Sequence, residues 1–423
     1  MLQLVFGRSG YGKTEYIRNR IADKIDRGET QVLLITPEQY SFISEYSLLE
    51  QLGEARAHAV RCLSFSRLCD ECDRLYGADG RKPLTKGGKA ILMKTAIDQV
   101  RPDLELFEKK GSSAAFVQSM TGIYDEMKSC NLTGAAVYAA ADDLDTDILR
   151  CKMRDFSRIM TAYEALLGDR FADPANRLTR LYDQIKDQNY FAGQTVFLDG
   201  FNGFVAQEYK ILERIIAEAK AVYIALDSDS FGTGDGYDLF AYVNETAGIL
   251  QRIADKAGVP TNALQLGENC RTDYADLRRV EQYIFADQAP ETEISSEHIR
   301  LYAASTVTDA CNDLALQIKG LLRCGYRAGE IAVTMRDREK YAPVLASAFE
   351  KYGVPYYADE RQPVTAQPIL VFPMYLMRSV IYGWRSDDLF SLIKTGLTDV
   401  SDSPDLHLSL IHISEPTRRR GIS

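Results

Sequence analysis

Residues 7–14, GRSGYGKT, follow the pattern G-x-x-x-x-G-K-[ST], which is typical of a loop that binds nucleotide phosphates. In such a loop the helix that follows points its N-terminal N–H groups at the phosphates. Lys13 would reach the β- and γ-phosphates, and the Thr14 hydroxyl would hold Mg²⁺. Glycines let the backbone wrap around the phosphates, and here these are Gly7, Gly10 and Gly12. The spacing therefore predicts a site for ATP and Mg²⁺.

A phosphate loop of this kind needs an acidic partner at the end of a neighbouring apolar strand. The apolar run VFL, residues 196–198, is followed directly by Asp199. We expect the Asp199 carboxylate to hold Mg²⁺ together with the Thr14 hydroxyl. Motor enzymes usually place a glutamate directly after this aspartate, where it activates the attacking water, but here the next residue is Gly200. Glu208 is expected on the following helix, out of reach. These residues predict a site that binds Mg-nucleotide and hydrolyses it poorly.

The elements around the loop are those of an α/β protein. Strands are predicted at residues 2–6, 31–36, 194–199 and 221–226, and helices at residues 14–27, 38–52 and 207–219. This alternation predicts a parallel sheet and a P-loop NTPase fold, with a first domain formed by residues 1–83 and 191–290.

Residues 84–190 have apolar side chains at helical spacing, which predicts an all-helical insertion in the first domain. A second α/β domain is expected over residues 297–407. Its strands are predicted at residues 299–304, 330–335 and 354–359, and its helices at residues 308–324 and 339–352. An acidic linker at residues 287–296 separates the two domains.

The last segment, residues 408–423, contains LSLIHISEPTR, the translation of a common sequencing-library adapter. We therefore expect residues 408–423 to be an artefact and assign them no part in the fold or the site. The natural protein is expected to be longer than this chain.

Composition limits the classes of function. The chain has 423 residues, 46% of them hydrophobic, and a net charge of −10, which argues against a surface generally adapted to nucleic acid but not against a local basic patch. Such a basic run exists at residues 81–94, although a solvated helix face explains such a run more often than a phosphate-binding track does. The longest apolar run, residues 369–377, contains Pro373 and is too short to span a membrane. With no signal peptide at its start, the chain is expected to be cytoplasmic.

Cys69 and Cys72 have the spacing of metal ligands, but a zinc or iron-sulfur site needs about four ligands and no second pair accompanies them. We expect these thiols to be buried on a helix.

Five blocks in one order resemble the N-terminal part of the AddB family, the second subunits of bacterial AddAB helicase-nucleases, to which RexB is related. They are GRSGYGKT, LLITPEQYSFISEYSLLE, RCLSFSRL, FLDGFNGF and EIAVTMRDREKYAPVLASAFEKYGVPYYADE, and the resemblance extends to about residue 398. It implies a superfamily-1 helicase scaffold of two RecA-like domains that has lost motor function.

The resemblance also implies partners and a setting. A full-length AddB-type subunit acts in recombinational repair of DNA double-strand breaks as a 5′–3′ exonuclease subunit, in a heterodimer with an AddA-type helicase/nuclease that supplies the motor. It binds DNA ends and single-stranded DNA, which it scans for a short regulatory sequence. Its iron-sulfur cluster and nuclease carboxylates are expected beyond residue 407. We therefore expect no nuclease activity from this chain.

Carried over residue by residue, the resemblance adds Arg336, which would lie near the nucleotide. It also implies that six residues face single-stranded DNA: Gln39, Ser41, Phe65, Arg67, Phe201 and Phe204. The sequence departs from the family at Asp70, where an aromatic residue is common and would offer a stacking platform.

Simpler explanations exist for several of these residues. Phe65 and Phe204 would equally serve core packing. Arg67 would pair with Asp70 or Glu71, and Gln39 would cap the helix after Pro37.

Two other functions are also consistent with the sequence. One is an active P-loop ATPase, a helicase or another nucleotide-dependent enzyme, with an unrecognised base. The other is a structural subunit in which nucleotide binding is vestigial.

Overall fold

The computed structural model describes residues 1–398 except 79, 111–112, 230–238, 287–294, 359–363 and 365–366. The chain divides into two compact units, Met1–Arg300 and Leu301–Ser423. Most of the acidic linker expected at residues 287–296 and the segment 408–423 lie outside the described residues.

The first unit contains a six-stranded sheet in the order β3-β2-β6-β7-β1-β8, and every strand pair in it is parallel. The strands are β1 (Leu2–Gly7), β2 (Val32–Ile35), β3 (Val60–Leu63), β6 (Thr195–Leu198), β7 (Ala221–Asp227) and β8 (Thr261–Gln265). Because the strands are parallel, their carboxyl ends meet at one edge of the sheet. That edge carries Gly7, Asp199 and Asp227.

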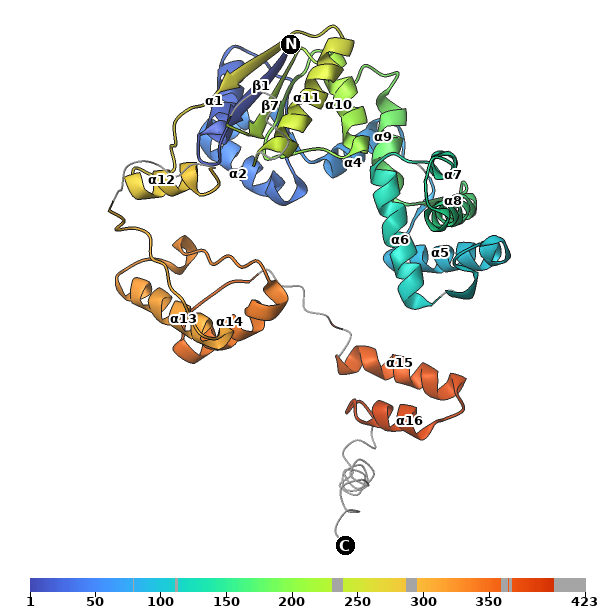
Figure 1. Ribbon diagram of the computed structural model, residues 1–423. Helices are drawn as coiled ribbons and strands as arrows, with labels where there is room; N and C mark the ends of the chain where they lie inside the picture. Colours follow the sequence, from blue (N-terminus) through green and yellow to red (C-terminus); the bar gives the residue numbers. More distant parts are fainter. Residues whose placement is uncertain are drawn as a thin grey trace. The chain divides into compact units, whose positions relative to one another are not determined.

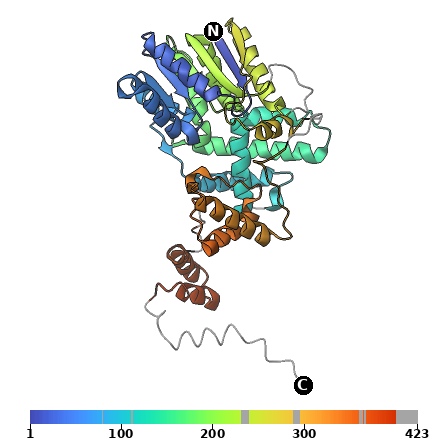
Figure 2. The same cartoon turned by 90° about the vertical axis from the view of Figure 1, so that its left-hand side faces the viewer.

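Helices cover both faces of this sheet (Figures 1 and 2). Alternate residues of a strand point to opposite faces, so that Leu34 of β2 packs with α1 (Lys13–Asp26) and α2 (Ser41–Leu52). Its neighbours Leu33 and Ile35 belong to the core on the other face. The helices of that core are α4 (Phe65–Tyr76), α9 (Arg177–Ile185), α10 (Ala206–Glu218) and α11 (Ala241–Lys256). The α/β class and the parallel sheet predicted from the sequence are confirmed.

Shorter elements complete the first unit. They are the 3-10 helix η1 (Glu38–Tyr40), the short helix α3 (Glu54–Ala57) and α12 (Ala275–Tyr283). The single helix predicted over residues 38–52 is thus divided into η1 and α2.

The segment between β3 and β6 has a hydrophobic core of its own. Beyond α4 it contains α5 (Lys86–Val100), α6 (Ala114–Ser129), α7 (Gly134–Ala141) and α8 (Asp147–Leu167), followed by η4 (Pro174–Asn176) and α9. Two residues of β4 (Lys82–Pro83) pair with β5 (Phe171–Ala172), so the segment is mainly but not entirely helical.

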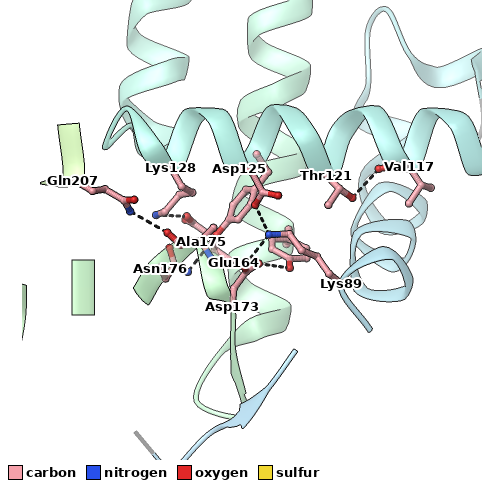
Figure 3. Close-up of polar contacts among 12 residues, drawn as sticks. Lys89, Val117, Thr121, Asp125, Lys128, Glu164, Asp173, Ala175, Asn176 and Gln207 are labelled. Atoms are coloured by element: carbon pink, nitrogen blue, oxygen red, sulfur yellow. Dashed lines mark hydrogen bonds and ion pairs between the residues drawn. The ribbon is translucent and has the colours of Figure 1, made fainter. Parts of the chain in front are cut away.

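An ion cluster centred on the buried Lys89 and Asp173 joins the helices of this segment (Figure 3). The Lys89 ammonium of α5 pairs with Asp125 of α6 and lies 2.8 Å from Asp173 Oδ1. The Tyr163 hydroxyl of α8 donates to Asp173 Oδ2 at 2.6 Å. The pKa of Tyr163 is raised by burial and by this carboxylate. Lys89, from the basic run, therefore serves packing.

The second unit has the predicted helices but lacks the predicted strands. Its helices are α13 (Val307–Arg323), α14 (Arg338–Tyr352), α15 (Pro368–Ile381) and α16 (Ser386–Ile393). The segments 299–304, 331–335 and 354–358 are not strands, because none forms a ladder with another segment in the described part of the chain. Ile331, Val333 and Met335 still point one face toward the core of α13 and α14. Among the described helices, none is long and apolar enough to cross a lipid bilayer.

Candidate nucleotide-binding site

The loop between β1 and α1 has the backbone that a phosphate cradle requires. Gly10 and Gly12 have φ of 89° and 78°, a left-handed conformation that glycine adopts without strain. The first N–H groups of α1 have no partner inside the helix and face the loop. An added Cβ at Gly7 would approach the Tyr11 Cβ to 3.1 Å. The three glycines are therefore required by the loop itself.

Lys13 begins α1 and folds back over the loop. Its Nζ donates to the carbonyl oxygens of Gly7 at 2.7 Å and Arg8 at 2.8 Å. It also forms an ion pair with Asp227 Oδ1 at 2.6 Å. The lysine side chain is only 10% exposed, whereas the Asp227 side chain is 43% exposed.

Asp199 follows β6 directly and lies against the start of α1. Burial raises the pKa of its carboxyl group, although a hydrogen bond with the Thr14 side chain and the charge of Lys13 act in the opposite direction. A hydroxyl and a carboxylate are the oxygen ligands that Mg²⁺ prefers. With the glycine loop and the lysine, Thr14 and Asp199 form a donor set that fits a Mg-nucleotide.

The backbone at position 200 explains why no carboxylate directly follows Asp199. Gly200 has a φ of 83°, and a Cβ at this position would lie 3.3 Å from Pro37 Cδ. A glutamate at position 200 would therefore be strained. Glu208 is used elsewhere, since its Oε2 accepts the Val205 N–H at 3.0 Å at the start of α10.

Two residues beside the loop are not among those predicted from the sequence. Asp227 ends the apolar strand β7, the same signal that identified Asp199, and could have been found. Arg271 lies beyond β8, where the Cys270 N–H donates to Gly10 O at 2.8 Å. A Cβ at Gly10 would approach the Arg271 Cβ to 3.0 Å, so a cationic side chain begins next to the loop. No local pattern signals Arg271.

A polar network joins the loop to α12 and to the end of β7. The Arg8 guanidinium lies 2.8 Å from Asp229 Oδ2 and 3.5 Å from Glu281 Oε1. The Tyr11 hydroxyl donates to Glu281 Oε2 at 3.3 Å. The side chains at the variable positions of the loop thus fix it to its surroundings.

The polar residues assigned to DNA by the resemblance have mixed environments. Gln39 is exposed in η1, where no side chain caps the helix, whereas Ser41 is buried at the start of α2. Arg67 is partly exposed and pairs with Glu45 at 3.3 Å instead of with Asp70 or Glu71. Gln39 and Arg67 are thus accessible, and Ser41 is not.

The aromatic residues assigned to DNA pack against one another. Phe65 and Phe204 are each 6% exposed and belong to the core beneath the sheet, against which the partly buried Phe201 also packs. The ring centroids of Phe65 and Phe201 are 5.8 Å apart, and those of Phe201 and Phe204 are 5.0 Å apart. Their environment in this structure is that of core packing.

The remaining predicted residues lie away from this edge or in the other unit. Arg336 is exposed in the second unit, directly after Met335. Cys69 and Cys72 are buried in α4, and burial raises their pKa values to about 11 and about 12. Neutral buried thiols suit packing better than metal binding.

Comparisons with known proteins agree on one family. A family model described as "ADDB, N-terminal" matches residues 4–281, more than half of the chain. Two clostridial proteins, from Clostridium botulinum (strain Langeland) and Clostridium tetani, are each 27% identical to it, over 95% and 94% of this chain. A protein from Thermoanaerobacter sp. (strain X514) is 25% identical over 95% of this chain. All three are named as the B subunit of an ATP-dependent helicase/deoxyribonuclease.

This chain spans only 36% of the length of the two clostridial relatives and 35% of the third. The matching family model nevertheless covers more than half of the chain. The chain belongs to the AddB N-terminal family.

Proposed function

We propose that this chain is the nucleotide-binding, non-motor part of a helicase-nuclease subunit that processes DNA double-strand breaks. The observation that carries the proposal is the edge of the sheet where the glycine loop, Lys13, Thr14 and Asp199 meet. ATP phosphates would lie against the loop and Lys13. Mg²⁺ would be held by Thr14 and Asp199 and would neutralise charge on the phosphates.

The missing base supports a non-motor role. Position 200 is a glycine with positive φ packed near Pro37, and Glu208 is engaged at the start of α10. Without a carboxylate directly after Asp199 to orient water, bound nucleotide would be hydrolysed slowly. Bound nucleotide would then stabilise this unit.

The names of the relatives support a wider proposal. A protein named as one subunit of a helicase/deoxyribonuclease implies a complex, and we propose an AddA-type partner and single-stranded DNA as ligands of the complete protein. Gln39 and Arg67 are the accessible candidates for DNA contact. The segment around residues 84–190 would be an insertion in the first of two RecA-like domains, and the protein would act in the cytoplasm.

Titration calorimetry with Mg-ATP tests the nucleotide site. The 423-residue chain should bind one Mg-ATP, and Lys13→Ala should weaken this binding strongly without unfolding the protein. If the wild-type chain binds no Mg-ATP yet still assembles with an AddA-type partner, the loop is vestigial and the proposal is wrong.

A filter-binding assay with fluorescently labelled oligonucleotides tests the DNA proposal separately. Single-stranded DNA should bind more tightly than duplex DNA, and Arg67→Ala should weaken binding. Arg74→Ala, on the same helix, is the matched control, since Arg74 donates to the Asp70 carbonyl within α4. Equal losses in both variants would contradict a specific role for Arg67.

A further inference from the structure

The ammonium group of Lys13 is already surrounded by three oxygen atoms of the protein. An ammonium carries three N–H donors, and Lys13 Nζ has three acceptors at hydrogen-bond distance. Two are loop carbonyls, Gly7 O and Arg8 O, at 2.7 and 2.8 Å, and the third is Asp227 Oδ1 at 2.6 Å. A phosphate oxygen that approaches Lys13 must therefore compete with these oxygen atoms for the ammonium group.

Asp227 is the acceptor that a phosphate would replace. The two carbonyls belong to the loop that surrounds the phosphates, whereas the Asp227 carboxylate comes from the end of a different strand, β7. It is also anionic, so a phosphate that approaches Lys13 would be repelled by Asp227 while competing with it for the same proton. Opening the ion pair is thus part of the cost of binding.

The position of Asp227 is fixed by its neighbours. Ser228 forms a bridge with Gly7, and its hydroxyl donates to Asn244 Oδ1 of α11 at 2.8 Å. Asp229 pairs with Arg8 at 2.8 Å. These contacts hold the backbone that carries Asp227 beside the loop, so that its carboxylate stays close to Lys13.

We propose that Asp227 acts as an internal competitor for the phosphate-binding lysine and so lowers the affinity of this site for nucleoside triphosphates. This inference rests on the proposed function of the same site. Nucleotide would bind in two coupled steps, release of Lys13 from Asp227 and capture of Lys13 by the phosphates. Neutralising Asp227 removes both the repulsion and most of the competition.

Calorimetric titration of the 423-residue chain with Mg-ATP tests the proposal through affinity. Asp227→Asn should bind Mg-ATP about tenfold more tightly than the wild type, a change of about 1.4 kcal/mol. Asp23→Asn is the charge control, because it removes one negative charge from α1 at a residue that pairs with Arg20 and lies outside the loop and the network that holds it. Its affinity should stay within about threefold of the wild type.

The direction of the change in Mg-ATP affinity separates this proposal from the alternative, in which Asp227 helps nucleotide to bind. If Asp227 instead positions Lys13 or helps to hold Mg²⁺, Asp227→Asn will bind Mg-ATP more weakly, and the proposal is overturned. Equal gains in Asp227→Asn and Asp23→Asn would also overturn it, since general charge would explain both. Asp227→Ala, which removes the acceptor altogether, should bind at least as tightly as Asp227→Asn, with thermal unfolding confirming that it is folded.

A result in which no variant binds Mg-ATP tests the nucleotide site itself and not the role of Asp227. If the wild type, Asp227→Asn and Asp227→Ala all fail to bind Mg-ATP while remaining folded, the proposed nucleotide site itself is wrong and the inference fails with it. Binding by the wild type with no gain in Asp227→Asn leaves the site intact and rejects only the competitor role.

Discussion

Two lysines of the first unit are almost equally buried and yet are suited to different tasks. Lys13 is 10% exposed and Lys89 is 9% exposed, and each is bonded to aspartate. Their carboxylates differ. Asp227 beside Lys13 is 43% exposed. Of the two carboxylates beside Lys89, Asp125 is 51% exposed and Asp173 is fully buried.

The burial of the carboxylate decides what each pair does. Asp173 has no access to water, so its charge depends on Lys89, on the Tyr163 hydroxyl and on the Ala175 N–H at 2.9 Å (Figure 3). Asp227 keeps contact with solvent and would remain hydrated if Lys13 moved away. A pair with one solvated partner is able to open for a ligand, whereas an enclosed pair holds helices together.

The largest expected effect is a loss of stability when the pair of Lys89 and the buried Asp173 is broken. Lys89→Met should lower the free energy of unfolding of the first unit by about 3–5 kcal/mol, because it leaves the buried charge of Asp173 without its cation. Urea unfolding followed by circular dichroism measures the change. Lys94→Met, whose partner Asp98 is exposed, is the control and should cost less than about 1 kcal/mol. A loss for Lys89→Met no larger than for this control would show that Asp173 is not dependent on Lys89.

A smaller effect, on Mg-ATP binding and not on stability, is expected at the pair of Lys13 and the exposed Asp227. Lys13→Ala should weaken Mg-ATP binding by about 10- to 100-fold, the equivalent of about 1.5–3 kcal/mol for hydrogen bonds to charged groups. The free energy of unfolding should change by less than about 1 kcal/mol, because Asp227 stays hydrated. Calorimetry and urea unfolding on the same samples give both numbers. A stability loss as large as that of Lys89→Met would remove the distinction between the two lysines.

Glu29 is intermediate in exposure between the buried Asp173 and the exposed Asp227, since its side chain is 18% exposed. Burial would raise the pKa of its carboxyl group, but hydrogen bonds from Lys220 and Thr195 and the charge of Lys24 lower it to about 2. A lowered pKa means that ionised Glu29 stabilises the fold above its ordinary pKa of 4.5, and that this stability is lost as the pH falls toward about 2.

Replacing Glu29 should therefore have a small, pH-dependent effect. Glu29→Gln should lower the free energy of unfolding by about 1 kcal/mol at pH 7. The difference from the wild type should shrink as the pH falls from about 4.5 toward about 2. Thermal unfolding at several pH values measures it. A difference that stays constant with pH would show that the ionisation of Glu29 does not contribute.

The sequence predicts those parts of the fold whose signal is local. Apolar runs at residues 2–6, 194–199 and 221–226 became strands β1, β6 and β7, and the glycine loop lies between β1 and α1 as expected. Strand β3 was missed because Arg61 interrupts its apolar pattern. Strand β8 was missed because it is an edge strand with polar, mostly exposed residues.

Features that depend on distant partners were harder to predict. The extended segments of the second unit have the right alternation of side chains, but a strand also needs a hydrogen-bonded neighbour, which the pattern cannot supply. In the same way, Arg271 comes next to Gly10 only because β8 pairs with β1. Phe65 and Phe204 look alike in sequence whether they stack on bases or fill a core, and only their burial distinguishes the two.

Steady-state ATP turnover, measured at saturating Mg-ATP with and without single-stranded DNA, tests the non-motor role most directly. The arrangement of Asp199, Gly200 and Glu208 predicts turnover that is slow and is not stimulated by DNA, in a chain that binds Mg-ATP. Turnover that rises strongly with single-stranded DNA and disappears in Lys13→Ala would contradict this role and identify an active motor.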